Sequence, residues 1–99
     1  MKFKIYQIKE EHTDVLFLSL DRLKHRNLEF DFLKYKKVYD GNMSINGLED
    51  IFTIFNIDRP ADFKGHSLSV SDVVQVVESN KVAPGYYFCD SFGWKEVEV

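Results

Sequence analysis

The sequence predicts an α+β fold, a single small domain built mainly on an antiparallel sheet and carrying two helices. The chain has 99 residues, which is too short for two separate hydrophobic cores. One segment, residues 47–56, repeats its apolar residues at a clear helical spacing, whereas several others alternate or form short apolar runs as strands do. Near the C-terminus, turn-forming residues separate three strand-like segments in succession, which favours a β-meander. We therefore expect one domain over residues 1–99.

The N-terminal residues predict a hairpin. Phe3 and Ile5 alternate with polar residues, which indicates a strand over residues 2–8. Residues 15–18 form a continuous apolar run, as expected of a strand that is buried on both faces. The polar residues between them are typical of a turn, and a connection this short joins antiparallel neighbours.

The first helix is expected at residues 20–26. Ser19 precedes it, and a serine hydroxyl at that position can accept a hydrogen bond from a free N–H of the first turn. Asn27 is a plausible end. Residues 28–34 leave strand and helix both open, because their apolar alternation breaks at Leu33.

Residues 35–39 are expected to form a strand that is closed by the turn pair Asp40-Gly41. The second helix is expected at residues 47–56, where Asn46 and Glu49 have the spacing of a capping box. Pro60 prevents a simple continuation of this helix. The apolar stripe of the helix consists of Leu48, Ile51, Phe52 and Phe55.

The rest of the chain is expected to form a structured loop over residues 57–71 and the three strands of the meander, at 73–77, 86–89 and 92–99. The 47–56 helix would cover one face of the sheet and leave the other face to water or to a partner.

The charges and the single cysteine limit the function classes. The net charge of −3 argues mildly against binding to nucleic-acid phosphates. Residues 1–40 hold nine Lys or Arg against seven Asp or Glu, whereas residues 41–99 hold four against nine. Cys89 has no second cysteine to pair with, which fits a reducing compartment. Neither a signal peptide nor a membrane-spanning segment is indicated, so a cytoplasmic location is expected.

No metal or cofactor site is predicted. The histidines and the cysteine match no zinc-binding spacing, and no glycine-rich loop opens a helix to hold a phosphate. The residues considered as metal ligands are His12, His25, His66 and Cys89.

Three serines and two aspartates are the remaining candidates for a catalytic or binding site. Ser67, Ser69 and Ser71 alternate, so in an extended segment they share one face, but no nucleophile elbow surrounds them. We expect their hydroxyls to bond to nearby backbone. Asp72 and Asp90 flank the predicted hairpin, where they either satisfy turn amides or form a pair that binds a cation or acts as acid and base.

Two segments carry a resemblance to a known family. The runs HSLSVSDVV at 66–74 and YYFCDSFGWKEV at 86–97 resemble the YodL-like family of small bacterial domains, and so do Tyr6-Gln7-Ile8-Lys9, Phe17 and Ser19 near the N-terminus. The resemblance covers nearly the whole chain. It implies an origin in Firmicutes, often on plasmids, phages and conjugative elements, alongside DNA-processing and antirestriction modules. The family that it resembles has no established enzymatic activity, so the resemblance transfers no catalytic residue.

The resemblance and the long polar loop together favour a non-enzymatic cytoplasmic protein-interaction or regulatory module. Its partner is an unidentified protein. The working surface would be the 58–72 loop and the adjoining strand edge, unless the loop is only a structural wrap held by Phe63 and Leu68. The candidate binding residues are Arg59, His66, Ser67, Ser69, Ser71, Asp72 and Asp90.

Two alternatives remain. One is a nucleic-acid-linked accessory or antirestriction-type protein, for which direct nucleic-acid binding is not favoured. The other is a small enzyme that uses His66 with Asp72 or Asp90, with both side chains converging in a concave pocket.

Overall fold

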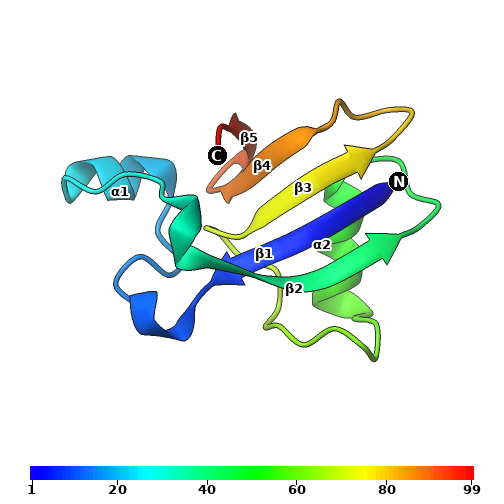
Figure 1. Cartoon of the computed structure of the whole chain (residues 1–99), viewed down its shortest axis with the longest axis horizontal. Coiled ribbons are helices and arrows are strands. Elements are labelled where there is room, and N and C mark those ends of the chain that lie inside the picture. The colour runs from blue at the N-terminus through cyan, green and yellow to red at the C-terminus, as the bar shows by residue number, and fades with distance from the viewer.

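A computed structural model describes residues 1–99 and contains one five-stranded antiparallel sheet with the strand order β2-β1-β3-β4-β5 (Figure 1). Two helices accompany the sheet, which confirms the predicted α+β class with its C-terminal meander. The strands are β1 (Lys2–Ile8), β2 (Tyr35–Asn42), β3 (Val73–Glu78), β4 (Gly85–Asp90) and β5 (Gly93–Val97). The helices are α1 (Leu20–His25) and α2 (Leu48–Ile57), and short 3-10 turns lie at Glu10–His12 and Phe32–Lys34.

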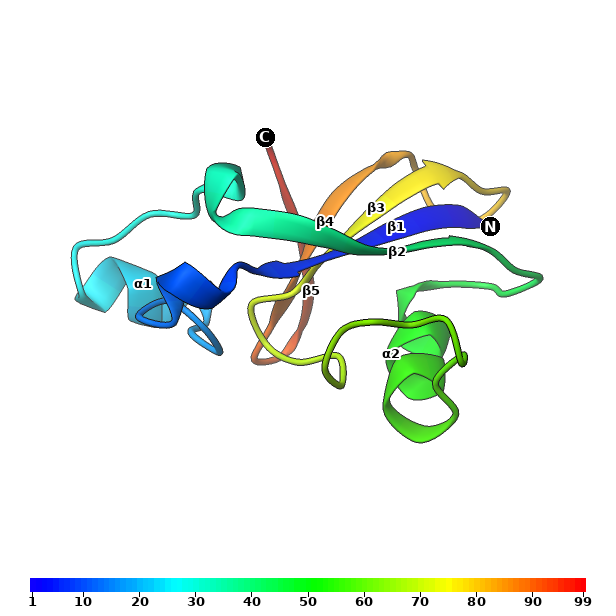
Figure 2. The same cartoon turned by 60° about the horizontal axis from the view of Figure 1, so that its bottom comes forward.

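Helix α2 covers one face of the sheet (Figure 2). Ile51 and Phe55 on the helix are fully buried against Phe3 and Ile5 of β1, as the apolar stripe predicts. Phe52, which was expected on the same stripe, is 37 % exposed. Phe3 and Phe55 meet edge to face, with ring centroids 6.1 Å apart. This layer fixes β1, the central element of the site described below.

The opposite face is not left wholly to water or to a partner, contrary to the expectation. At one end of the sheet, the segment between β1 and β2 packs a second cluster against it. Ile8 and Phe88, whose side chains point to the face opposite that of Phe3 and Ile5, are buried there with Val15 and Leu23. Both faces of the sheet thus contribute to the hydrophobic core.

The predicted hairpin of residues 2–8 and 15–18 is wrong, because the neighbours of β1 are β2 and β3. Val15 is buried, but the backbone turns, with Leu18 N–H donating to Val15 O. Phe17 has a φ of 65°, a left-handed conformation that a strand does not accommodate.

The pair Asp40-Gly41 forms no turn and lies inside β2, where Gly41 is paired with Phe3. A Cβ on Gly41 would meet the rings of Phe3 and Tyr39 at less than 3.0 Å, so the glycine serves close packing here.

The capping box is also wrong in detail. The N-cap of α2 is Gly47, Glu49 is exposed, and the Asp50 carboxylate accepts a hydrogen bond from Asn46 N–H. The cap of α1 is confirmed, since Ser19 Oγ accepts from Arg22 N–H at 3.2 Å. Residues 28–34, for which the sequence left both strand and helix possible, contain a 3-10 turn at Phe32–Lys34.

The segment between α2 and β3, residues 58–72, has no helix or strand. Leu68 is buried in the core under α2, and the Phe63 ring lies against those of Phe55 and Tyr39. The two apolar side chains therefore hold the loop, as the structural-wrap interpretation predicts. Neither α1 nor α2 has the length and apolar content needed to cross a bilayer.

Candidate functional site

Gln7 connects the 58–72 loop to the central strand. It is the last residue of the Phe3–Ile5–Gln7 row on the buried face of β1, and it is 2 % exposed. Its side-chain oxygen accepts from His66 N–H at 3.2 Å, and its amide nitrogen donates to His66 O at 3.0 Å. Gly65 makes this contact possible, because a Cβ there would clash with the Gln7 side-chain oxygen.

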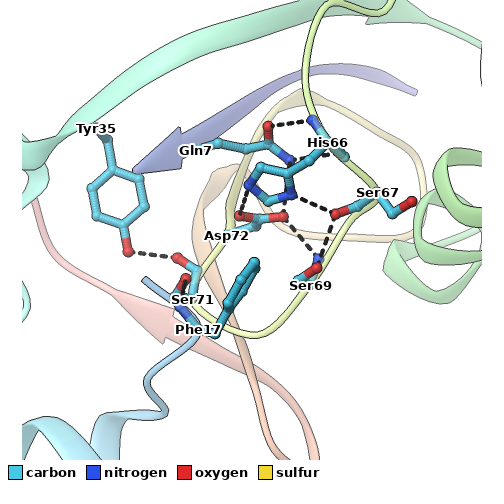
Figure 3. A network of polar contacts seen from close by, with 8 residues as sticks. All are labelled: Gln7, Phe17, Tyr35, His66, Ser67, Ser69, Ser71 and Asp72. Atoms are coloured by element: carbon cyan, nitrogen blue, oxygen red, sulfur yellow. Dashed lines mark hydrogen bonds and ion pairs between the residues drawn. The ribbon is translucent and has the colours of Figure 1, made fainter. Parts of the chain in front are cut away.

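Asp72 is the buried end of this network (Figure 3). Its Oδ2 accepts hydrogen bonds from Gln7 Nε2 at 3.0 Å and from Ser69 N–H at 2.8 Å. Burial raises the pKa of Asp72 to about 7, although these two hydrogen bonds oppose the shift. The carboxyl therefore exchanges its proton near neutral pH.

His66 faces the other oxygen of Asp72. Its Nε2 lies 3.9 Å from Asp72 Oδ1, and both atoms are buried without a hydrogen-bond partner. Its Nδ1 lies 2.7 Å from Ser67 O, which can only accept, so Nδ1 carries the hydrogen of that bond. At 3.9 Å the two atoms are too far apart for a hydrogen bond, so they face each other as buried polar atoms without a partner.

Ser71 fastens the same loop to the rest of the fold. Its φ of 87° is in the left-handed region, and it is 1 % exposed. Its carbonyl accepts from Tyr35 Oη at 2.5 Å, its Oγ accepts from Phe17 N–H at 3.0 Å, and its N–H donates to Cys89 O. These three bonds offset the backbone strain.

An open groove of about 310 Å³ lies beside this network. One wall is the loop at Lys64–His66, and the other includes Lys36 and Val38 of the edge strand β2. Lys9, Glu10, Thr13 and Leu16 from the segment that follows β1 also line the groove, together with Gln7 and Ile8. Three lysines face one carboxylate there, so the groove carries a positive charge on a chain of net charge −3.

The YodL-like domain model matches residues 2–99. The chain belongs to the YodL-like family. No curated protein and no solved structure matches it. The family description names no activity, so the function of this YodL-like domain has to be argued from the site itself.

The YodL-like domain brings four of the predicted residues together. His66, Ser69, Ser71 and Asp72 all belong to the network just described, and Ser67 contributes its carbonyl. Ser69 Oγ donates to Ser67 O, which fits the expectation that the serines bond to nearby backbone.

Arg59 and Asp90 lie outside that network. Arg59 is exposed and does not line the groove. Asp90 Oδ1 accepts from Leu20 N–H at 3.3 Å and from Ser91 N–H at 3.0 Å, so it ties the turn before β5 to the start of α1. This is the turn-amide role that the sequence offered as the first of two possibilities.

Four residues of the YodL-like site were missed by sequence reasoning. Gln7 could have been found from the sequence, because it follows Phe3 and Ile5 on the buried face of the strand. A polar side chain at such a position needs hydrogen-bond partners within the protein. Lys9, Lys36 and Lys64 come from three separate segments, and only the folded structure brings them together around the groove.

The acid–base chemistry open to this YodL-like domain is narrow. Asp72 is fully buried, so it can act only through another group. Both ring nitrogens of His66 face protein atoms, and burial raises the pKa of the Cys89 thiol to about 12. No three His, Cys, Asp or Glu side chains gather where they could hold a metal ion.

Proposed function

We propose that this YodL-like domain is a non-enzymatic, cytoplasmic protein-binding or regulatory module. Its working surface is the groove between the 58–72 loop and the edge of β2, with Lys9, Lys36 and Lys64 as its charged residues. The family resemblance adds a setting among the accessory proteins of mobile genetic elements.

The groove is the observation that carries the proposal. Three regions far apart in the sequence, residues 7–16, 36–38 and 64–66, line it, and the Gln7–His66–Asp72 network holds one wall in place. A polar network that fixes a loop next to an open groove is more elaborate than a connection between α2 and β3 requires. A rigid wall lowers the entropy lost when a partner binds.

The orientation of His66 supports binding over catalysis. A histidine that works as a general base keeps one ring nitrogen for its orienting group and directs the other at the substrate. Here Nδ1 is bonded to Ser67 O and the buried Nε2 faces Asp72, which leaves no ring nitrogen for a substrate in the groove. The His66–Asp72 pair is better suited to positioning the loop.

Affinity capture from the native host tests the proposal. The bait is the intact chain, compared with a Lys64→Glu variant and with a Lys81→Glu control on the exposed β3–β4 connection. We expect a discrete protein to be retained by the wild type and by the control and to be lost from the groove variant. Equal retention by all three would move the surface elsewhere.

An activity measurement separates the enzymatic alternative. If His66→Gln abolished the turnover of any substrate by the purified chain while the fold stayed intact, the protein would be an enzyme and this proposal would fail.

A further inference from the structure

The outer edge of β2 is a vacant strand-pairing position directly beside the groove. β2 is the first strand in the order β2-β1-β3-β4-β5, so its outer backbone groups have no neighbouring strand (Figure 1). The free edge runs over eight residues, Tyr35–Asn42. An unpaired edge of this kind can accept an extended segment by backbone hydrogen bonding.

The charges at this edge select what can pair with it. Lys36 and Lys37 are exposed in its first half, and Lys9 and Lys64 line the groove. Lys37 is bonded to Asp40 at 2.5 Å, and Glu10 lies 3.7 Å from Lys36. Beyond these two pairs, Lys9 and Lys64 give the groove an excess of positive charge, which would attract a segment bearing carboxylates.

The geometry of an added strand directs its side chains toward these lysines. Lys36 and Val38 line the groove from β2, on the side of the sheet that α2 covers. Alternate side chains of a strand added at this edge would point to that same side. Carboxylates at alternate positions would therefore approach Lys36, Lys64 and Lys9, and apolar atoms could contact Val38 and Leu16.

Resting on the function proposed above, we propose that the groove and the β2 edge bind an extended acidic peptide segment of another protein. The segment adds to β2 as a sixth strand and presents carboxylates at every second residue. The groove favours a peptide over a nucleic acid, because no Phe, Tyr or Trp lines it as a stacking platform and none of its cations is an arginine.

Fluorescence anisotropy with defined probes tests the ligand class. The probe is a labelled ten-residue peptide that alternates glutamate with valine or threonine, titrated with the full chain. Its counterparts are the same peptide with lysine for glutamate, the acidic peptide N-methylated at alternate amides, and a ten-nucleotide single-stranded DNA. We expect only the unmodified acidic peptide to bind.

Two charge-matched variants locate the binding. A Lys36→Glu, Lys64→Glu double variant should weaken the acidic peptide by about tenfold or more. A Lys81→Glu, Lys95→Glu variant changes the net charge equally but away from the groove, and should leave the affinity within about twofold. Circular dichroism checks that both variants are folded.

The inference would be overturned if the acidic peptide did not bind, or if both double variants lost affinity for it equally. It would also be overturned if the N-methylated peptide bound as well as the unmodified one, or if the DNA bound and lost its affinity in the groove variant. If a partner protein is still captured through Lys64 while the acidic peptide fails, the ligand class is wrong and the binding module stands. If capture fails as well, both proposals fall.

Discussion

Asp72 is the residue through which we expect pH to act on the stability of the domain. It has no exposed surface, and its pKa is raised to about 7 by burial. Below pH 4 the carboxyl is protonated in both the folded and the unfolded chain, so it does not affect stability. Between pH 4 and pH 7 the folded chain keeps the proton and the unfolded chain loses it, so the free energy of unfolding falls as the pH rises.

Replacing Asp72 with asparagine should remove this pH dependence. The side-chain oxygen of the asparagine can accept from Gln7 and Ser69, and the side chain has no charge whose burial would cost stability at high pH. The rise of the Asp72 pKa from 3.8 to about 7 corresponds to about 4 kcal/mol, so Asp72→Asn should gain up to about that much over the wild type between pH 4 and pH 8. Urea unfolding of both proteins across this pH range measures the difference.

Asp72→Ala is the control for that experiment. It also abolishes the titration, but it leaves the Gln7 amide and Ser69 N–H without their acceptor, so below pH 4 it should destabilise by about 2 to 4 kcal/mol. The difference from the wild type should shrink toward pH 8, because only the wild type loses stability as Asp72 ionises. If Asp72→Asn had the same pH profile as the wild type, Asp72 would not be the titrating group.

Gln7 should matter as much as a large core residue. Gln7→Ala removes three hydrogen bonds to the loop and leaves buried partners unsatisfied, so we expect a loss of about 2 to 4 kcal/mol. Hydrogen exchange at His66 and Ser69 should accelerate more than exchange in β4. Uniform acceleration would mean that Gln7 stabilises the whole domain and not the loop.

At the scale of elements, the 58–72 loop behaves as a fixed wall and not as a mobile connection. Phe63 and Leu68 anchor it in the core, and Gln7 and Asp72 bind its backbone. At Gly65 the loop passes so close to β1 that a Cβ would overlap the Gln7 side-chain oxygen, so this position is sensitive to a small substitution.

Gly65→Ala should displace this wall. The added methyl group would overlap the Gln7 side-chain oxygen, so we expect a loss of about 2 kcal/mol or more and weaker binding in the groove. Gly47→Ala is the matched control, since nothing lies within 4 Å of a Cβ there and the φ of −170° suits any residue. Thermal unfolding of the two variants should differ clearly. Equal effects would contradict the close contact.

The sequence predicted correctly those elements that depend on residues close together in the chain. The Ser19 cap and the strands of the meander depend on neighbouring residues, and they formed as predicted. The α2 stripe also formed, except that Phe52 is 37 % exposed. The predicted 15–18 strand failed because its burial comes from packing under the sheet and not from strand pairing. Asp40-Gly41 has the composition of a turn, yet its glycine is set by the ring of Phe3, which is distant in sequence.

The site could be predicted only in part, for the same reason. His66 and Asp72 lie on one loop, so the sequence could nominate them together. Their 3.9 Å approach depends on Gln7, which is 59 residues away from His66 in the chain. The lysines of the groove converge through the path of the loop, which no local pattern encodes.

At the scale of the whole molecule, the charge is divided between two regions. The first 40 residues carry the positive excess and supply Lys9 and Lys36 to the groove, whereas the β5 end carries Glu96 and Glu98. β2 and β5 are the two edges of the sheet, so one edge is basic and the other bears acidic residues. A partner that recognises charge would distinguish the two edges.

Site-specific photo-crosslinking in the native host tests the binding groove most directly. A photoreactive amino acid replaces Thr13, which is exposed and lines the groove, or Ser91, which is exposed at the turn before β5. We predict a discrete protein adduct from position 13 and none from position 91. An adduct only from position 91, or no adduct from either position, would contradict a binding surface at the groove.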